Sequence, residues 1–283
     1  MPLDLGLEVP EKPKEEKKET KPITDDEAKT MIDRAENREY SSFMCCLVVG
    51  QDDTGKTGIV MDYCSNLPKK TLVLDLDLGS YEVKSTYHKE DKNIIIPNDI
   101  MVMEKTEKDI VINYEKTITN LKALVKYVKD HHNEYSAIIV DGISTLLKYA
   151  EYIMRIDKSI APDGGVQLRY WIQRNKTFIE FLEAVKSVTG VDKFFIGHED
   201  FIVGDEAASV KVKTNQMIHQ RIICKKIKEQ GADKKPTGNI LYTATIDKSK
   251  YNLKKQGKEY TFATVPKEGE PTWNIKGIFE GLK

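Results

Sequence analysis

Short apolar runs recur along the chain, and polar or amphipathic stretches separate them. Apolar runs of this length are typical of strands that are buried on both faces of a parallel sheet. The expected strands cover residues 43–49, 71–76, 135–141, 193–198 and 240–246. A weaker apolar stretch at 94–103 predicts a short strand or strand pair near the edge of the sheet.

Amphipathic stretches lie between these runs. In residues 114–130 the apolar positions recur at helical spacing, and similar patterns predict helices over 144–158 and 168–188. The residues after the first strand, from Gly58 onward, can also begin a helix. Alternating strands and helices favour an α/β fold with a mainly parallel central sheet and helices on both faces.

The first 39 residues differ in character from the rest. Residues 1–23 are rich in Pro, Glu and Lys, which predicts a disordered charged tail. Residues 24–39 are expected to form an amphipathic helix, with Thr24 and Glu27 spaced as in a capping box. Its apolar stripe would pack on its own domain or on a neighbouring subunit. The main domain is expected to span 40–283, including strands near its C-terminus. The stripe consists of Ala28, Met31, Ile32 and Ala35.

Composition adds few constraints. The 283 residues are 40% apolar and carry a net charge of −1, so global charge predicts no partner. No apolar run approaches the ~20 residues that span a bilayer, and no signal peptide is apparent. We therefore expect a cytoplasmic protein with no membrane partner. Metal or redox spacing is absent among the cysteines, which predicts reduced thiols; they are Cys45, Cys46, Cys64 and Cys224.

Residues 50–57 match the phosphate-binding P-loop pattern G-x-x-x-x-G-K-[ST] between a predicted strand and a predicted helix. Such a loop directs main-chain N–H groups at a phosphate chain. Lys56 would reach the β- and γ-phosphates, and the Thr57 hydroxyl would bind Mg²⁺. The expected nucleotide-binding residues are Gly50, Gln51, Asp52, Asp53, Thr54, Gly55, Lys56, Thr57 and Gly58.

Asp141 is the second anchor, because it ends an apolar strand as a Walker B aspartate does and would hold Mg²⁺. Ligands of open parallel sheets bind at the carboxyl ends of the strands, so Asp141 and the P-loop should converge. The next residue is Gly142, whereas many P-loop motors have a water-activating Glu there. We expect Asp77 to be the base, with Asp75 as the next candidate. The alternative is that both acids simply cap the strand end.

On these motifs the chain resembles the RecA-type branch of P-loop ATPases, over roughly residues 40–255. Phage and archaeal single-strand annealing and recombination ATPases are among the similar proteins. The resemblance implies a base at the end of the strand after the P-loop helix, where Asp77 replaces the usual Glu. It also implies a γ-phosphate sensor at the end of the next strand after Asp141, where His198 stands. A buried structural histidine is the alternative for His198.

The same resemblance gives a role to two lysines near the C-terminus. In RecA-type proteins a K-x-K or K-x-R pair reaches the γ-phosphate of the neighbouring subunit and stabilises transition-state charge. Lys248 and Lys250 have this spacing, and they could act in this way only in a homo-oligomer. The alternative is a pair of solvated lysines on a turn.

Residues 200–235 are the candidate nucleic-acid loop, because RecA-type proteins place DNA-binding loops after the sensor strand. Basic residues accumulate there, which suits contact with the phosphates of single-stranded DNA. A solvated charged face is the alternative, since strong aromatic content for base stacking is lacking. The basic residues are Lys211, Lys213, Arg221, Lys225, Lys226, Lys228, Lys234 and Lys235, with Asn215, Gln216, His219 and Gln220 as polar contacts.

The sequence thus predicts an ATP-binding, Mg²⁺-dependent ATPase that acts on DNA in recombination, annealing or repair. The alternative is a nucleotide-dependent regulatory ATPase or switch that binds a protein partner through the N-terminal tail and helix. A small-molecule kinase ranks lower, because no Arg-rich lid is evident. A GTPase is disfavoured because Asn175 and Lys176 lack the Asp that reads guanine and lie in a predicted helix.

Overall fold

The computed structural model describes residues 24–36, 43–105, 109–199, 214, 216–232 and 234–282. The chain divides into two units, Met1–Ser41 and Ser42–Lys283. In the first unit, helix α1 spans Asp25–Glu36. The expected capping box is confirmed, since the Thr24 N–H donates to Glu27 Oε2 at 2.8 Å and the Glu27 N–H donates to Thr24 Oγ1 at 3.3 Å.

The second unit is built on a nine-stranded sheet in the order β11-β10-β9-β8-β1-β7-β6-β2-β3. From β8 to β3 all neighbours are parallel, whereas β8 to β11 pair antiparallel. The strands are β1 Cys45–Gly50, β2 Lys70–Asp75, β3 Ile94–Ile95, β6 Tyr135–Asp141, β7 Asp192–His198, β8 Gln220–Gln230, β9 Pro236–Ser249, β10 Glu259–Val265 and β11 Thr272–Trp273.

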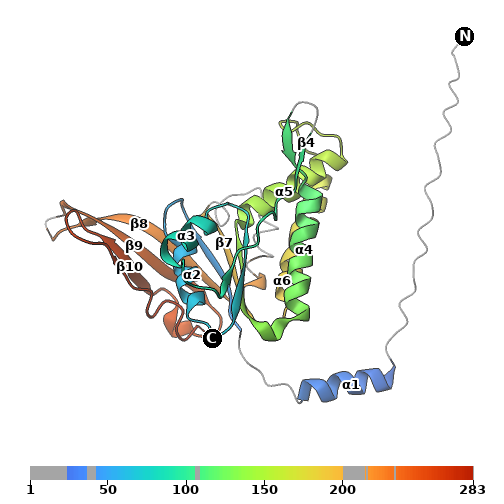
Figure 1. The fold of residues 1–283 in the computed structure, drawn as a ribbon, viewed down its shortest axis with the longest axis horizontal. Coiled ribbons are helices and arrows are strands. Elements are labelled where there is room, and N and C mark those ends of the chain that lie inside the picture. The colour runs from blue at the N-terminus through green and yellow to red at the C-terminus, as the bar shows by residue number, and fades with distance from the viewer. Residues whose placement is uncertain are drawn as a thin grey trace, which may run out of the picture. The chain divides into compact units, whose positions relative to one another are not determined.

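Helices cover both faces of this sheet (Figure 1). The first face carries α4, α5 and α6, and the second carries α2 and α3. Successive side chains of β1 supply both layers: Leu47 packs with the α4–α6 face and Val48 with the α2 face. The helices are α2 Lys56–Ser65, α3 Ser80–Tyr87, α4 Tyr114–Asp130, α5 Ile143–Asp157 and α6 Trp171–Lys186, with 3-10 turns at His132–Glu134, Leu168–Tyr170 and Leu253–Lys255.

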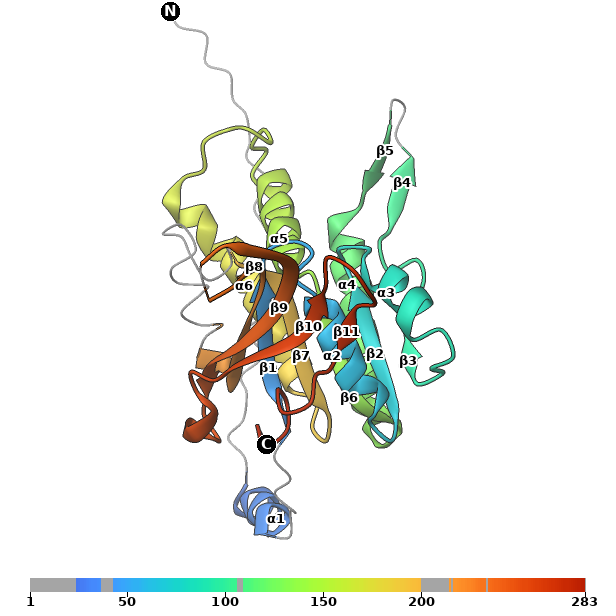
Figure 2. The ribbon, with the colours of Figure 1, turned by 90° about the vertical axis from the view of Figure 1, so that its left-hand side faces the viewer.

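The α/β fold expected from the apolar pattern is confirmed, and most elements lie within a few residues of their predicted bounds. The helix predicted over 168–188 is a 3-10 turn followed by α6. All four cysteines are free and buried, as expected. Residues 94–103 divide differently: β3 joins the sheet edge, while β4 (Met103–Lys105) pairs with β5 (Ile110–Ile112) in a separate hairpin (Figure 2).

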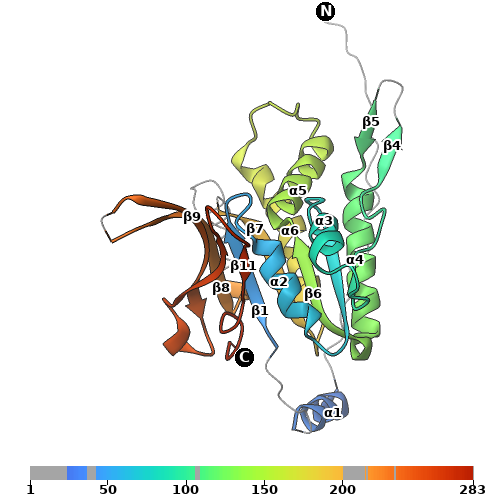
Figure 3. The same ribbon diagram turned by 60° about the vertical axis from the view of Figure 1, so that its left-hand side comes forward.

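The expectation of a loop over 200–235 is wrong for its second half. Residues 220–230 form strand β8, which lies parallel to β1 and antiparallel to β9. Its inner half is buried, but beyond Cys224 it continues beside β9 as the β8–β9 ribbon, which projects from the domain (Figure 3) and which β10 borders as far as Ile240. A ribbon of this kind exposes both faces, so its lysines interrupt the apolar pattern by which a strand is recognised. Residues 200–213, 215 and 233 lie outside the described residues.

Candidate functional site

The carboxyl ends of four neighbouring strands meet at one edge of the sheet. Gly50, Asp75, Asp141 and His198 are the last residues of β1, β2, β6 and β7. The pairing register aligns Gly50 with His198 and Asp75 with Asp141. Strand β7, which ends at His198, lies between β1 and β6. The convergence expected for the P-loop and the acidic strand end is therefore observed.

The loop after β1 is tightly folded and closely packed. Gly55, directly before α2, has φ +76°, a conformation that glycine adopts without a Cβ penalty. A Cβ built on Gly50 would lie 2.4 Å from the carbonyl oxygen of Cys224, so only glycine fits there. Asp53 also has a positive φ, of 54°. Thr54 Oγ1 donates to the carbonyl of Gln51 at 2.8 Å and tightens the loop from within.

Lys56, the first residue of α2, folds across this loop. Its Nζ donates to the carbonyl oxygens of Gly50 at 3.1 Å and Gln51 at 2.6 Å. The ammonium group therefore lies directly beside the loop backbone. A cation and a helix N-terminus at one point favour the binding of a polyphosphate.

Thr57 and Asp141 meet between α2 and β6. Thr57 Oγ1 donates to Asp141 Oδ2 at 2.8 Å, and Ser80 Oγ donates to the same oxygen at 2.6 Å. Asp141 is 3% exposed. Burial raises its pKa to about 6, the two hydroxyl donors oppose the rise, and the charges of Asp75 and Asp77 add to it. Asp141 is thus a carboxylate that gains from a nearby cation.

The donor set at this point fits Mg²⁺. Thr57, Ser80 and Asp141 offer hydroxyl and carboxylate oxygens, the hard ligands that Mg²⁺ prefers. Among the described residues, no three or more His, Cys, Asp or Glu side chains group as a complete metal site. Mg²⁺ is usually held by one or two protein groups together with phosphate oxygens.

Asp77 lies just beyond β2 and faces the start of α5. Thr145 Oγ1 donates to Asp77 Oδ1 at 2.5 Å. Gly142 has φ +99°, and a Cβ built there would lie 2.6 Å from the same Asp77 oxygen. The Asp77 carboxylate thus occupies the space into which a side chain at position 142 would project. The Asp77 carboxylate can take this position only because residue 142 is a glycine.

Asp75 has a different environment. Its Oδ2 accepts the main-chain N–H groups of Ser80 at 3.0 Å and Tyr81 at 3.3 Å, at the start of α3. The carboxyl is 6% exposed, and burial raises its pKa while these amides oppose the rise. Its Oδ1 is among the buried side-chain atoms without a hydrogen-bond partner. Asp75 thus caps the start of α3, which is a structural role related to the strand-end alternative.

His198 lies between the P-loop and Asp77. Its Nδ1 is 3.0 Å from Asp52 Oδ1, and its Nε2 is 3.8 Å from Asp77 Oδ2. Its main-chain N–H donates to Ser144 Oγ at 3.1 Å. The imidazole is 40% exposed, so it is not the buried structural histidine of the alternative interpretation.

Lys248 and Lys250 lie toward the end of the sheet at which β1 begins, away from the carboxyl ends of the parallel strands. Lys248 belongs to β9 rather than to a turn, and it pairs with Arg221. The neighbouring Ser249 pairs with Gln220, which is level with Cys46 at the start of β1. Burial and the charges of Lys250 and Arg221 lower the pKa of Lys248. The lysines are therefore separated along the strands from the P-loop of their own chain.

The basic segment is only partly described. Lys211, Lys213 and Asn215 lie outside the described residues. The lysines of the β8–β9 ribbon are exposed, whereas Gln220 is buried and donates to the carbonyl of Leu282 at 2.6 Å. Arg221 is ion-paired with Asp247. His219 interacts with the Tyr251 hydroxyl at 2.8 Å, and Gln216 is exposed. Within the described part of this segment, the exposed lysines therefore lie on the ribbon.

The structure adds site residues that the sequence did not single out. Ser80 reaches Asp141 across 61 positions of the chain, and Thr145 reaches Asp77 across 68. Phe262 and Trp273 approach the loop at Gly55 and Gly58. No short-range spacing in the sequence identifies these residues. Thr145 alone has a local signal, because it lies in the first turn of the helix that directly follows Asp141.

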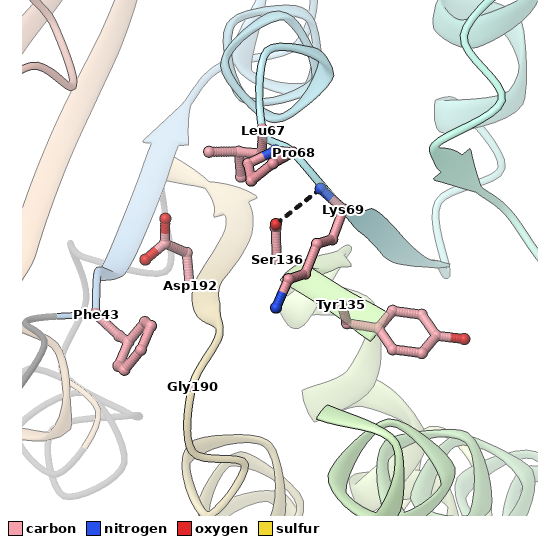
Figure 4. A pocket seen from close by; sticks show the side chains of 8 residues that line it. All are labelled: Phe43, Leu67, Pro68, Lys69, Tyr135, Ser136, Gly190 and Asp192. Carbon is pink, nitrogen blue, oxygen red and sulfur yellow. Dashed lines mark hydrogen bonds between the residues drawn. The ribbon is translucent and has the colours of Figure 1, made fainter. Parts of the chain in front are cut away.

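A separate hollow of about 210 Å³ lies at the opposite edge of the sheet (Figure 4). It is lined by Phe43, Tyr135 and Asp192, at the amino ends of the strands, and by residues after α2. The buried Asp192 accepts the main-chain N–H of Met44 at 2.8 Å, which is a structural role. This hollow is no part of the phosphate site. In the part of the chain that the structure describes, no helix is long and apolar enough to cross a membrane.

Comparison with known proteins agrees with this geometry. A family model described as an AAA domain matches residues 42–229, so β9, β10 and β11 lie beyond the matched range. No curated protein matches the chain. Two similar solved structures are the RadB recombinase and a type III secretion system ATPase of pathogenic bacteria.

The RadB recombinase is 12% identical, with a TM-score of 0.45 over 83% of this chain and 94% of that chain. The secretion ATPase is 11% identical, with a TM-score of 0.43 over 65% of this chain and 53% of that chain. With TM-scores below 0.5, neither similarity bears on what this chain does.

Proposed function

This chain belongs to the AAA domain family, a family of P-loop ATPases, and we propose that it hydrolyses ATP in a Mg²⁺-dependent reaction coupled to single-stranded DNA. The observation that carries the proposal is the pairing of Thr57 Oγ1 with Asp141 Oδ2 at 2.8 Å, beside a glycine-bounded loop and Lys56. These groups together match the needs of a triphosphate with its metal ion.

In this proposal residues 50–58 hold the phosphates through main-chain N–H groups, and Lys56 neutralises the β- and γ-phosphates. Thr57 and Asp141 hold Mg²⁺, with Ser80 fixing the orientation of the Asp141 carboxylate. Bound Mg²⁺ supplies positive charge that stabilises the developing negative charge on the phosphate oxygens. Because Lys56 already contacts loop carbonyls, the nucleotide would exchange these contacts for phosphate oxygens.

We assign Asp77 as the base that orients and deprotonates the attacking water. Its Oδ1 accepts a hydrogen bond from the Thr145 hydroxyl, so Oδ2 is the oxygen that would accept a hydrogen bond from water. His198, close to Asp52 of the loop and to Asp77 Oδ2, would report the γ-phosphate to β7. Asp75 caps α3 and is assigned a positioning role only.

Single-stranded DNA is assigned to the β8–β9 ribbon. Within the described part of residues 225–235, five lysines accompany one glutamate, and Glu229 already accepts from Thr237 and Asn239. Lys226 and Lys228 share one face of β8, and Lys226 Nζ lies 5.6 Å from the ring centre of Tyr242. Cations beside an aromatic ring suit a flexible single strand.

The ribbon begins at the nucleotide loop. The carbonyl of Cys224 packs on Gly50, and Lys225 follows immediately. A shift of the loop on nucleotide binding would therefore reach the ribbon, and DNA would in turn affect turnover. The same proposal includes a homo-oligomer, because Lys248 and Lys250 could reach only the γ-phosphate of a neighbouring subunit.

The test is an ATPase assay with and without single-stranded DNA, read beside the size-exclusion mass under both conditions. We expect DNA to raise turnover and to bind in an ATP- and salt-dependent way. Lys56→Ala should abolish nucleotide binding or hydrolysis. The double variant Lys226→Glu, Lys228→Glu should weaken DNA binding and flatten its salt dependence, with the slope falling by about 0.7 for each phosphate that the ribbon no longer neutralises.

The matched control is Lys89→Glu, Lys92→Glu, which changes the charge equally at exposed positions beside β3, far from the ribbon in the strand order. It should bind DNA as the wild type does. If ATPase activity is the same with and without DNA, and no DNA binds at low salt, the assignment of DNA to the ribbon is contradicted. Nucleotide-dependent capture of a protein partner that is lost on deleting residues 1–39 would then favour the regulatory alternative.

A further inference from the structure

An aromatic pair from the C-terminal strands packs against the P-loop. Phe262 on β10 and Trp273 on β11 meet edge to face, with ring centres 5.2 Å apart and planes at 79°. A Cβ built on Gly55 would lie 2.9 Å from Phe262, and one built on Gly58 would lie 3.0 Å from Trp273. The two glycines thus let both rings approach the loop and the first turn of α2.

The two rings differ in exposure. Phe262 is 1% exposed and belongs to the core between the sheet and α2. Trp273 is 47% exposed, so a large part of the indole surface is open to solvent. Folding normally removes a ring of this size from water. An indole held against a buried ring and a ligand-binding loop, with the rest of its surface open, is suited to stack on a planar ligand.

The direction of a bound triphosphate brings its base to this ring. Asp141 and His198 end strands on one side of β1, and Asp77 follows β2 on the same side. The site proposed above places the γ-phosphate among these three residues. Strands β8 to β11 lie on the other side of β1. The sugar and base lie at the opposite end of the triphosphate from the γ-phosphate. They therefore leave the loop past Gly58, toward Trp273.

We infer that Trp273 is the stacking platform for the nucleobase, with Phe262 as the buried ring that holds the indole against the loop; this inference rests on the nucleotide site proposed above. The platform belongs to β10 and β11, outside the matched family range. Stacking tolerates any base, because each base has a π-face. Trp273 accordingly adds affinity for a nucleoside triphosphate over inorganic tripolyphosphate.

The test compares Mg-ATP with inorganic tripolyphosphate by calorimetric titration of the full chain. Trp273→Ala should weaken ATP binding roughly 5- to 150-fold, the range of base–aromatic stacking, and leave tripolyphosphate binding unchanged. Trp273→Phe keeps a ring and should restore most of the affinity. The matched control is Trp171→Phe, since the second tryptophan of the chain lies on α6 with the Arg174 guanidinium 4.2 Å from its ring centre.

Trp171→Phe also leaves Trp273 as the single tryptophan, so its fluorescence should change with ATP and stay constant with tripolyphosphate. Wild-type ATP affinity in Trp273→Ala would overturn the inference. Equal weakening of both ligands would also overturn it, because the ring would then only support the loop. If the wild type binds ATP no more tightly than it binds tripolyphosphate, the stacking role of Trp273 is excluded and the phosphate site is not. If it binds neither ligand, the proposed nucleotide site fails with it.

Discussion

Replacing Asp141 by Asn should make the ligand-free protein more stable while removing its response to Mg²⁺ and nucleotide. The Asp141 carboxyl is buried beside Asp75 and Asp77, and its pKa rises from 3.8 to about 6. This rise in the pKa corresponds to a folding penalty of about 3 kcal/mol for the ionised form. Asn has the same shape and no charge, and its amide oxygen can accept from Thr57 and Ser80 as the carboxylate does.

The sign of the effect follows from the two pKa values. Below about pH 4 the carboxyl is protonated in the folded and unfolded chains alike, so the penalty vanishes. Between about pH 4 and about pH 6 the folded chain keeps a proton that the unfolded chain has lost, so the penalty grows with pH. Above about pH 6 the group is ionised in both states and the full penalty applies.

The assay is urea denaturation between pH 4 and pH 8, without metal and then with Mg²⁺ and ATP. Without metal, Asp141→Asn should unfold with a free energy about 3 kcal/mol above that of the wild type at pH 8, and the difference should fall toward zero near pH 4. Mg-ATP should stabilise only the wild type. The control Asp163→Asn, in an exposed loop, should change stability by no more than about 0.5 kcal/mol at any pH.

A variant less stable than the wild type at pH 8 would refute this reasoning, because the carboxylate would then be satisfied by its hydroxyl donors. A stability gain that does not vary with pH would refute it as well, since the gain would not come from ionisation. Full stabilisation of the variant by Mg-ATP would remove Asp141 from the proposed metal site.

Three further predictions concern the same edge of the sheet and the lysine pair. Gly142→Ala should lower the free energy of unfolding by roughly 1–3 kcal/mol, because φ is +99° and the new Cβ would meet the Asp77 carboxylate; an unchanged urea midpoint would contradict this. Asp77→Asn should lower kcat by about 10²-fold or more and leave the nucleotide Kd unchanged, and wild-type turnover in this variant would exclude Asp77 as the base. Asp75→Asn should instead change the urea midpoint of unfolding and have little effect on kcat. Lys248→Ala with Lys250→Ala should lower kcat in steady-state kinetics without affecting nucleotide binding, and unchanged turnover would exclude a role for these lysines at the γ-phosphate of a neighbouring subunit.

Much of the fold was predictable because its signals are local. Strands β1, β2, β6 and β7 are buried on both faces, so each is a continuous apolar run. Strand β8 was missed because only its inner half is buried, and its outer half, with Lys225 and Lys228, belongs to an exposed ribbon. A strand whose environment changes along its length has no single pattern to recognise.

The candidate site divides in the same way. The P-loop and Asp141 follow from spacing, since a glycine loop between a strand and a helix has few conformations, and strand ends in a parallel sheet share an edge. The different environments of Asp75 and Asp77 did not follow, because a capping role and an exposed carboxylate differ only in what packs around them.

The sequence by itself determined the P-loop, the parallel strand core and the acid that faces the loop, because these depend on backbone conformation and on burial along a few neighbouring residues. Only the tertiary structure decided that Ser80 meets Asp141, that Thr145 meets Asp77 and that Trp273 packs beside Gly58. These contacts join residues far apart in the chain. The path of the backbone brings them together, and no local spacing encodes that path.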